Sequence, residues 1–371
     1  MTLSILHTAL IREQTEPIAQ RLDALMLVQQ DINARQRAID KKLDQIHALL
    51  GDSPVPTTPT PVDPPDVIPP VQPPPASPPV TPPAAGLGPI RAAYIGNDPK
   101  DADAHDRWLG DGRKTAVCVF TEGRDWVASS DISWWLKPGN GNPNWPATGR
   151  KIFWSIPLHP KNSNLEDVIA GKWDAYFRRI ARQLADAYPG QPIHIRLGWE
   201  MNGSWFPWTI HGGRHELYKS AWRRAVGNFR TVDADFLFEW CTNQGTSGAN
   251  PELAYPGDDV VDIIAQDFYW NNDDPRYDDT DPVKAFAAKL HQPHGLAWLA
   301  AFAAARGKPI AIPEWGVKGN NAGPYIAAFK AWMLTVPMVY HGLWDSDAAY
   351  TGRLSGNRWP ATGAAYKAAF A

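Results

Sequence analysis

The sequence predicts an α/β protein: a (β/α)8 TIM barrel preceded by an N-terminal coiled-coil helix and a Pro-rich linker. Three observations predict it. Residues 11–50 repeat apolar side chains in a 3,4 rhythm, fifteen prolines fall between Pro54 and Pro83, and all 18 tryptophans lie beyond residue 107. The expected domains are therefore 1–50, 51–86 and 87–371.

The first segment reads as nearly five heptads on one register, with Pro17 at the first turn of the helix. The d positions are Ile18, Leu25, Ile32, Ile39 and Ile46, and the a positions are Leu22, Gln29, Gln36, Leu43 and Leu50. Leucine at a with isoleucine at d favours trimers or tetramers, so residues 11–50 predict a homo-oligomer. The alternative is an amphipathic helix packed on its own barrel.

The linker, residues 51–86, has no aromatic residue and cannot build a core. Its prolines predict a semi-rigid polyproline II spacer of roughly 100 Å, at ~3.1 Å per residue.

Beyond the linker, short apolar segments alternate with helical patterns, which is typical of a parallel barrel whose active site lies at the C-terminal strand ends. The expected strands are 91–95, 115–120, 151–156, 193–198, 236–241, 261–268, 309–313 and 338–343. The expected helices are 166–188, 215–230, 283–305 and 323–334.

Composition excludes several classes of function. Lys and Arg total 36 against 39 Asp and Glu, so no basic field for nucleic acid or anionic membranes is expected. No apolar run approaches the ~20 residues of a membrane span. Cys118 and Cys241 lie in strand-like runs and are expected to be buried thiols rather than a disulfide. The N-terminus lacks the cationic region of a signal peptide.

Two predicted strands end in a glutamate beside tryptophan. The first is HIRLGWEMNGSWFPW, from His194 to Trp208, and the second is PIAIPEWGV at 309–317. Aromatic surroundings raise a carboxyl pKa, as a general acid requires, so Glu200 is a candidate acid and Glu314 its partner. The plainer alternative is an ion pair between Arg196 and Glu200, which alternation places in phase.

The motif EMNGSWFPW resembles the acid/base motif of glycoside hydrolase family 26, the β-mannanase family, and PEWG resembles the nucleophile motif of its clan of retaining (β/α)8 glycosidases. The resemblance covers residues 90–371. It implies a retaining endo-glycosidase with Glu200 as acid/base and Glu314 as nucleophile, their carboxyl groups about 5–5.5 Å apart. It also implies that Tyr269 hydrogen-bonds the nucleophile and that Trp344 floors the sugar subsite. Trp199 departs from the family, which usually has histidine there, and from the clan, which usually has asparagine.

Residues around these motifs and at the other strand ends are candidates for binding sugar, because sugar rings stack on aromatic faces. They are His159, Arg196, Trp199, Asn202, Trp205, Trp208, Tyr269, Trp270, Trp315 and Trp344. No metal site and no cofactor is expected, since no ligand spacing, phosphate loop or dinucleotide fingerprint occurs.

An oligomeric stalk that holds barrels at a distance resembles a virion-associated polysaccharide depolymerase of a bacteriophage, so the expected location is virion-associated or extracellular. Two rival hypotheses remain: a non-catalytic carbohydrate-binding or attachment protein on a glycosidase-like barrel, and a cell-wall glycosidase with a lytic role. Sugar, linkage and endo or exo action are not fixed by the sequence.

Overall fold

The computed structural model describes residues 89–245, 247–272 and 278–371. The predicted coiled-coil helix, residues 1–50, and the Pro-rich linker, residues 51–86, lie outside the described residues. Both stay predictions, as does the oligomer that they imply.

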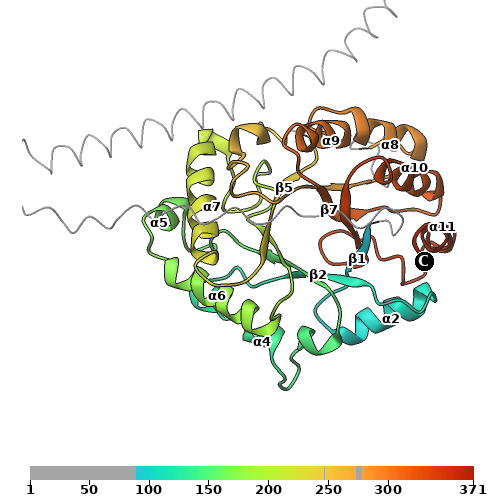
Figure 1. The fold of residues 1–371 in the computed structure, drawn as a ribbon. Helices are drawn as coiled ribbons and strands as arrows, with labels where there is room; N and C mark the ends of the chain where they lie inside the picture. Colours follow the sequence, from blue (N-terminus) through green and yellow to red (C-terminus); the bar gives the residue numbers. More distant parts are fainter. Residues whose placement is uncertain (1–88, 246, 273–277) are drawn as a thin grey trace, which may run out of the picture. The chain divides into compact units, whose positions relative to one another are not determined.

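Eight parallel strands pair in chain order and close into a barrel, with β8 hydrogen-bonded to β1 (Figure 1). This confirms the predicted barrel, and each expected strand is present. The strands are β1 (Ile90–Tyr94), β2 (Ala116–Phe120), β3 (Ile152–Ile156), β4 (Ile193–Leu197), β5 (Phe236–Asn243), β6 (Ile263–Tyr269), β7 (Ile310–Gly316) and β8 (Met338–Trp344).

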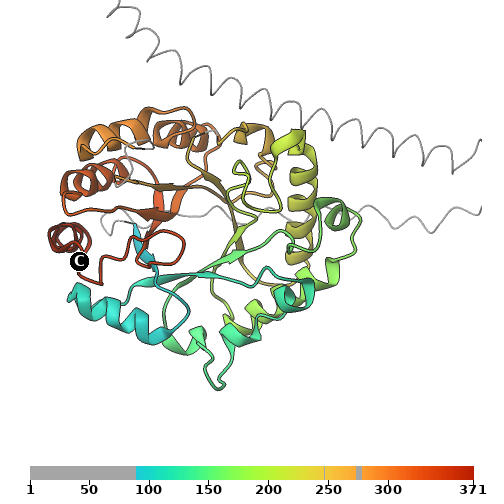
Figure 2. The same ribbon diagram turned by 180° about the vertical axis from the view of Figure 1, so that it is seen from behind.

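Helices surround the barrel in both views (Figures 1 and 2). They are α2 (Pro99–Leu109), α3 (Trp126–Ser130), α4 (Ser133–Leu136), α5 (Leu165–Ile169), α6 (Asp174–Ala187), α7 (His215–Phe229), α8 (Pro282–His291), α9 (Leu296–Ala304), α10 (Gly323–Met333) and α11 (Pro360–Phe370). Short 3-10 turns are η1 (Trp145–Thr148), η2 (His211–Gly213) and η3 (Pro251–Ala254). Within the described residues, no helix combines the length and the hydropathy that crossing a bilayer requires.

The predicted helices at 166–188 and 283–305 are each two helices. Gly171 has a φ of +79°, a backbone conformation that ends α5 before α6 begins. Pro293 and Gly295 lie between α8 and α9, where proline removes a backbone donor and glycine tolerates the turn. The sequence predicted one helix in each case because the apolar positions after each break continue the spacing of a single helix.

Aromatic side chains fill much of the core. Among the largest fully buried side chains are those of Trp145, Trp154, Trp222, Trp240, Trp270 and Trp315. Cys118 and Cys241 are buried and free, which confirms the expectation of thiols rather than a disulfide. Many tryptophans of this chain therefore serve packing.

Strands β6 and β7 are irregular near their C-terminal ends. Their mutual register shifts between Ala265 and Phe268, and β7 shifts against β8 between Ile312 and Trp315. Pro313 has no N–H for the ladder, and a Cβ at Gly342 of β8 would lie 2.1 Å from the Pro313 carbonyl oxygen. Glycine at that position therefore permits the bulge, and such bulges re-aim neighbouring side chains.

Candidate active site

Glu200 lies three residues beyond the end of β4, in a backbone conformation unusual for glutamate. Its φ is +53°, in the left-handed region that costs a residue with a Cβ about 1–2 kcal/mol. The Glu200 N–H donates to the carbonyl of Cys241 in β5 at 2.8 Å, which fixes the turn to the neighbouring strand. Strain of this kind concentrates at functional sites, where surrounding contacts hold it.

The Glu200 carboxyl is buried and accepts one hydrogen bond on each oxygen. The Asn243 side chain donates to Oε1 at 2.8 Å, and the Trp205 indole N–H donates to Oε2 at 2.7 Å. Burial, and after it the charge of Glu314, raise the pKa of Glu200 to about 7, although the two donors oppose the rise. Glu200 is thus poised to hold or release a proton near neutral pH.

Glu314 lies in the irregular part of β7, and its two oxygens contact different partners. The Tyr269 hydroxyl at the end of β6 donates to Oε2 at 2.5 Å. The Arg196 guanidinium forms an ion pair with Oε1 at 2.6 Å. Among the residues that the structure describes, no cation forms an ion pair with Glu200, so the two carboxyl groups occupy electrostatically different environments.

Arg196 of β4 organises the centre of the site. Its guanidinium also pairs with Asp267 of β6 at 2.7 Å, and its Nε donates to the Ser155 hydroxyl of β3 at 2.9 Å. Burial works against the charged form, but Asp267 and Glu314 outweigh it and raise the pKa of Arg196. Arg196 therefore forms its ion pairs with Asp267 and Glu314. The alternative prediction, a plain ion pair between Arg196 and Glu200, is wrong.

An aromatic wall borders these groups. Tyr94 at the end of β1 stacks on Trp344 at the end of β8, with ring centroids 4.2 Å apart. The Phe120 ring, at the end of β2, meets Trp199 edge-on at 5.4 Å. Trp205 is 54% exposed while its N–H contacts Glu200, so it combines a free aromatic surface with direct contact to a carboxyl group.

Several candidates for sugar binding prove to be packing or positioning residues. Trp270 and Trp315 are fully buried: Trp270 stacks on Tyr325 at 5.0 Å, and Trp315 donates to His341. Neither side chain has surface left for a sugar. Arg196 is 1% exposed, and its guanidinium pairs with Glu314 and Asp267, so it is not free to bind substrate.

Asn202 is likewise fully buried, and its side chain hydrogen-bonds to backbone groups at the end of β5 and just beyond it. Its amide donates to the carbonyls of Asn243 and Gly245, and its oxygen accepts from the Asn243 N–H. These contacts hold the backbone of Asn243, whose side chain in turn holds Glu200. Asn202 therefore positions Asn243, and its side chain is not available for the predicted role in binding sugar.

His159 and Trp208 also face the interior. Trp208 donates to the Trp199 carbonyl at 2.7 Å and stacks on Phe206. Burial lowers the pKa of His159, whose Nδ1 contacts the Pro160 carbonyl at 2.9 Å. The structure thus brings Glu200, Glu314, Arg196, Trp199, Trp205, Tyr269 and Trp344 into one connected site.

The prediction of binding residues omitted Tyr94, Phe120 and Asp267. All three lie at or near the C-terminal end of a strand, which is the signal that could have found them. Within the ranges that the structure describes, no three His, Cys, Asp or Glu side chains cluster as metal ligands.

Comparison with known proteins gives three results. Residues 157–332 match the family described as glycosyl hydrolase family 26. Endoglucanase H of Acetivibrio thermocellus is 31% identical over 186 residues, which are 48% of this chain and 19% of that protein, so the chain spans about a fifth of this relative.

Solved structures share the fold. The catalytic domain of the Bacillus sp. JAMB-750 endo-β-1,4-mannanase aligns with a TM-score of 0.51 at 19% identity, over 67% of this chain and 72% of that one. The mannanase of Bacillus subtilis aligns with a TM-score of 0.50 at 16% identity, over 74% and 83%.

Proposed function

We propose that the chain is a retaining endo-glycosidase that hydrolyses a polysaccharide, because residues 157–332 match glycosyl hydrolase family 26. One observation carries the proposal. Glu200 has a pKa raised to about 7, whereas Glu314 is held by the Arg196 cation and the Tyr269 hydroxyl. Two carboxyl groups with environments pushed apart in this way support the assignment of an acid and a nucleophile, as in a retaining glycosidase.

In the first step, a Glu314 oxygen attacks the anomeric carbon while Glu200 gives its proton to the glycosidic oxygen. The glycosidic C–O bond breaks, an ester bond to Glu314 forms, and the sugar beyond the cleaved bond leaves with the proton. Arg196 and Tyr269 keep the attacking carboxylate oriented, and both contacts are present before substrate binds.

In the second step, the ionised Glu200 takes a proton from water, and the water oxygen attacks the same anomeric carbon. The ester bond breaks and Glu314 leaves as carboxylate. The donors from Asn243 and Trp205 stabilise ionised Glu200 between the two steps. The scheme expects the two carboxyl groups about 5–5.5 Å apart.

The proposed substrates are β-linked glucans and mannans, because the relatives include an endoglucanase and mannanases. The choice between them turns on Trp199, whose ring lies 5.1 Å from the Arg196 guanidinium carbon and is buried against Phe120 and Phe206. The indole at this position can donate one hydrogen bond to a sugar hydroxyl but, unlike histidine or asparagine, it cannot accept one.

The test is a reducing-end assay of the purified chain against mannans, β-glucans, xylans and bacterial exopolysaccharides, with wild type and Glu314→Ala in parallel. New reducing ends from wild type alone would establish a glycosidase that uses Glu314 and would identify the substrate class. Retained hydrolysis by Glu314→Ala would refute the assigned nucleophile.

Trp199 also favours a second candidate, a non-catalytic carbohydrate-binding protein on the same barrel, because it replaces a polar residue next to the acid/base position. This candidate requires that wild type releases no reducing ends from any polysaccharide that it retards in affinity electrophoresis. Turbidity loss on bacterial cells, without activity on soluble polymers, would favour the lytic glycosidase instead.

The proposed setting is a virion-associated or extracellular trimer or tetramer, built through residues 11–50 and spaced from the barrels by residues 51–86. It rests on the heptads and prolines of the sequence alone. Sedimentation of the full chain as a monomer would remove its physical basis.

A further inference from the structure

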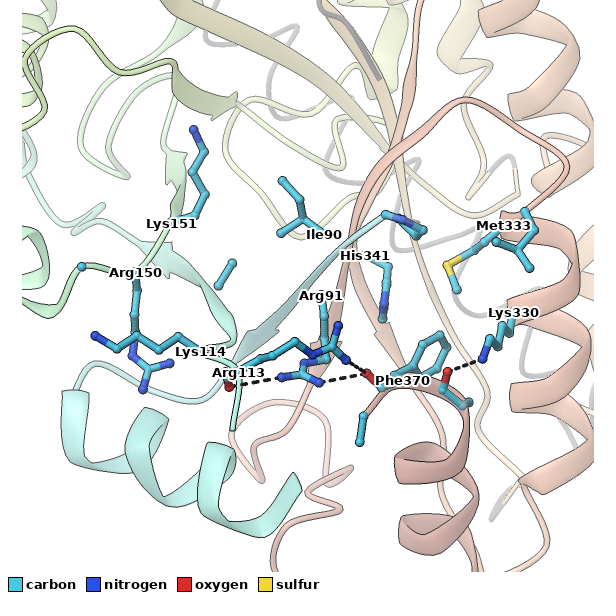
Figure 3. A pocket seen from close by; sticks show the side chains of 16 residues that line it. Ile90, Arg91, Arg113, Lys114, Arg150, Lys151, Lys330, Met333, His341 and Phe370 are labelled. Carbon is cyan, nitrogen blue, oxygen red and sulfur yellow. Dashed lines mark hydrogen bonds between the residues drawn. The ribbon is translucent and has the colours of Figure 1, made fainter. Parts of the chain in front are cut away.

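A cavity of about 470 Å³ lies at the N-terminal end of the barrel (Figure 3). Its lining includes the first residues of β1, the residues just before β2 and β3, and the last residues of α10 and α11. Glu200 and Glu314 belong to the opposite, C-terminal strand ends. The cavity is therefore separate from the proposed active site, on the barrel face where catalytic residues are not expected.

Six cationic side chains line this cavity, although the whole chain has a net charge of −3. Two Arg-Lys pairs produce most of the cluster, since Arg113-Lys114 comes directly before β2 and Arg150-Lys151 directly before β3. Adjacent parallel strands begin at the same edge of a sheet, so the two pairs become neighbours on folding. The six are Arg91, Arg113, Lys114, Arg150, Lys151 and Lys330.

The arginines have carboxylate partners. Asp111 pairs with Arg91 at 2.6 Å and with Arg113 at 2.7 Å. Arg150 pairs with Asp103 and Asp106, each at 2.6 Å.

The three lysines lack such partners among the residues that the structure describes. Lys114 donates to the Thr148 carbonyl at 2.7 Å, Lys151 to the Pro192 carbonyl at 2.5 Å, and Lys330 to the Ala369 carbonyl at 2.5 Å. Three carboxylates against six cationic side chains leave a positive excess. Burial lowers the pKa of His341 to about 3, so this imidazole adds no charge.

Two buried donors at the cavity have no acceptor in the described structure. They are the Nε–H groups of Arg91 and Arg150. The Arg91 side chain is 8% exposed and Arg150 is 6% exposed, so bulk water is a poor substitute. An unpaired buried donor of a charged group is destabilising, so this wall of the cavity favours an added acceptor.

We propose that this cavity binds a small oxyanion, one that carries carboxylate or phosphate groups. Its oxygens would lie among the three lysines and the exposed guanidinium of Arg113, where charge-assisted bonds are strongest. Ile90, Met333 and Phe370 supply an apolar side that suits a carbon skeleton or sugar ring. The volume falls in the range of about 300–1,000 Å³ that is usual for small-molecule sites.

Such a ligand would join the starts of three strands to the ends of α10 and α11. Since it binds the folded chain and not the unfolded one, it raises the unfolding temperature increasingly as its concentration exceeds its dissociation constant. This effect does not depend on glycosidase activity, so failure of either proposal leaves the other standing.

The test is calorimetric titration and thermal unfolding of the full chain at constant ionic strength, which holds general screening fixed. The probes are inorganic phosphate, citrate and glucuronate, with chloride and glucose as controls. We expect saturable binding of at least one oxyanion, with a rise in unfolding temperature, and none with chloride or glucose. The ranking of phosphate, citrate and glucuronate distinguishes a phosphorylated ligand from a polycarboxylate or an acidic sugar.

Lys114→Gln and Lys330→Gln each remove a positive charge from the cavity. In wild type these ammonium groups donate hydrogen bonds only to backbone carbonyls, so the ligand-free variants should keep their fold. We expect each to weaken binding roughly tenfold, the value of one charge-assisted contact. Lys100→Gln and Lys284→Gln, exposed lysines outside the cavity, are the matched controls and should change nothing. Equal losses in both sets, or no saturable binding of any oxyanion to wild type, would overturn the proposal.

Discussion

Two buried polar layers cross the interior of this barrel, and β4 contributes to both. His194 belongs to the lower layer, with Glu239 and Tyr340, and Arg196 belongs to the upper layer, with Asp267 and Glu314. The two β4 residues are two positions apart, so alternation sends both side chains into the barrel.

The lower layer is closed. Glu239 is fully buried, accepts from His194 at 3.1 Å and from the Tyr340 hydroxyl at 2.6 Å, and thereby uses both oxygens. Phe153 stacks on Tyr340 with ring centroids 3.6 Å apart and closes one side. Burial lowers the pKa of His194, so the ring is neutral and its Nδ1–H donates a hydrogen bond to Glu239.

The upper layer is not closed in this way. It brings Glu200, Asp267 and Glu314 near the single cation Arg196, and one buried oxygen of Asp267 lacks a hydrogen-bond partner in the described structure. Its rim carries exposed aromatic surface at Trp205. Burial of charge is common to both layers, so the surplus of acid and the open rim distinguish the site that can do chemistry.

The largest expected difference between the layers comes from one substitution made in each. Glu314→Gln should lower turnover at least about 10⁴-fold, because an amide cannot act as the nucleophile. Glu239→Gln should leave turnover within a few-fold and lower the free energy of unfolding by about 1–3 kcal/mol, since one acceptor is lost. Reducing-end rates and urea unfolding of both variants check this. Equal losses of turnover would mean that the layers are not functionally distinct.

Removing the cation should affect stability most. Arg196→Met leaves Asp267 and Glu314 without their shared ion pair, which costs about 3–5 kcal/mol of unfolding free energy. His194→Phe in the lower layer removes a neutral donor, so we expect a smaller loss, about 1–3 kcal/mol. Denaturant unfolding at pH 8 compares them. The deficit of Arg196→Met should shrink at pH 5, where carboxylates take up protons, and a deficit that is independent of pH would contradict the ion-pair explanation.

The upper layer should also set the pH dependence. Because the pKa of Glu200 is raised from 4.5 to about 7, the acid is protonated below pH 7 and kcat/KM should fall as pH rises through about 7.

The same shift links pH to stability. A raised pKa favours folding below pH 4.5, and this advantage disappears as pH rises through 7. Glu200→Gln, which cannot ionise, should therefore be more stable than wild type at pH 8, by about 1–3 kcal/mol. Wild type and variant with equal stability at pH 5 and pH 8 would contradict it.

The sequence predicted the barrel well because a buried parallel strand is a short apolar run that can be recognised locally. It also singled out Glu200 and Glu314 as candidates, because they stand in recognisable motifs. Asp267 was missed because its importance lies in its contact with Arg196, 71 positions away. The buried Trp270 and Trp315 were misjudged for the matching reason, since tryptophan looks the same in a sequence whether it packs or binds.

The smallest expected effect is a difference in what changes: a substitution in the upper layer should shift the pH–rate profile, whereas its counterpart in the lower layer should change only stability. Trp205→Phe keeps an aromatic ring but removes the donor to Glu200, which stabilises the ionised carboxyl. The basic limb of kcat/KM should therefore move upward, by about half to one pH unit. Tyr340→Phe removes one donor to Glu239 in the same manner, and it should cost about 1 kcal/mol of stability without moving the limb. A pH–rate profile of both variants decides the matter: a shift in Tyr340→Phe as large as that in Trp205→Phe would mean that the lower layer, too, controls the proton on Glu200.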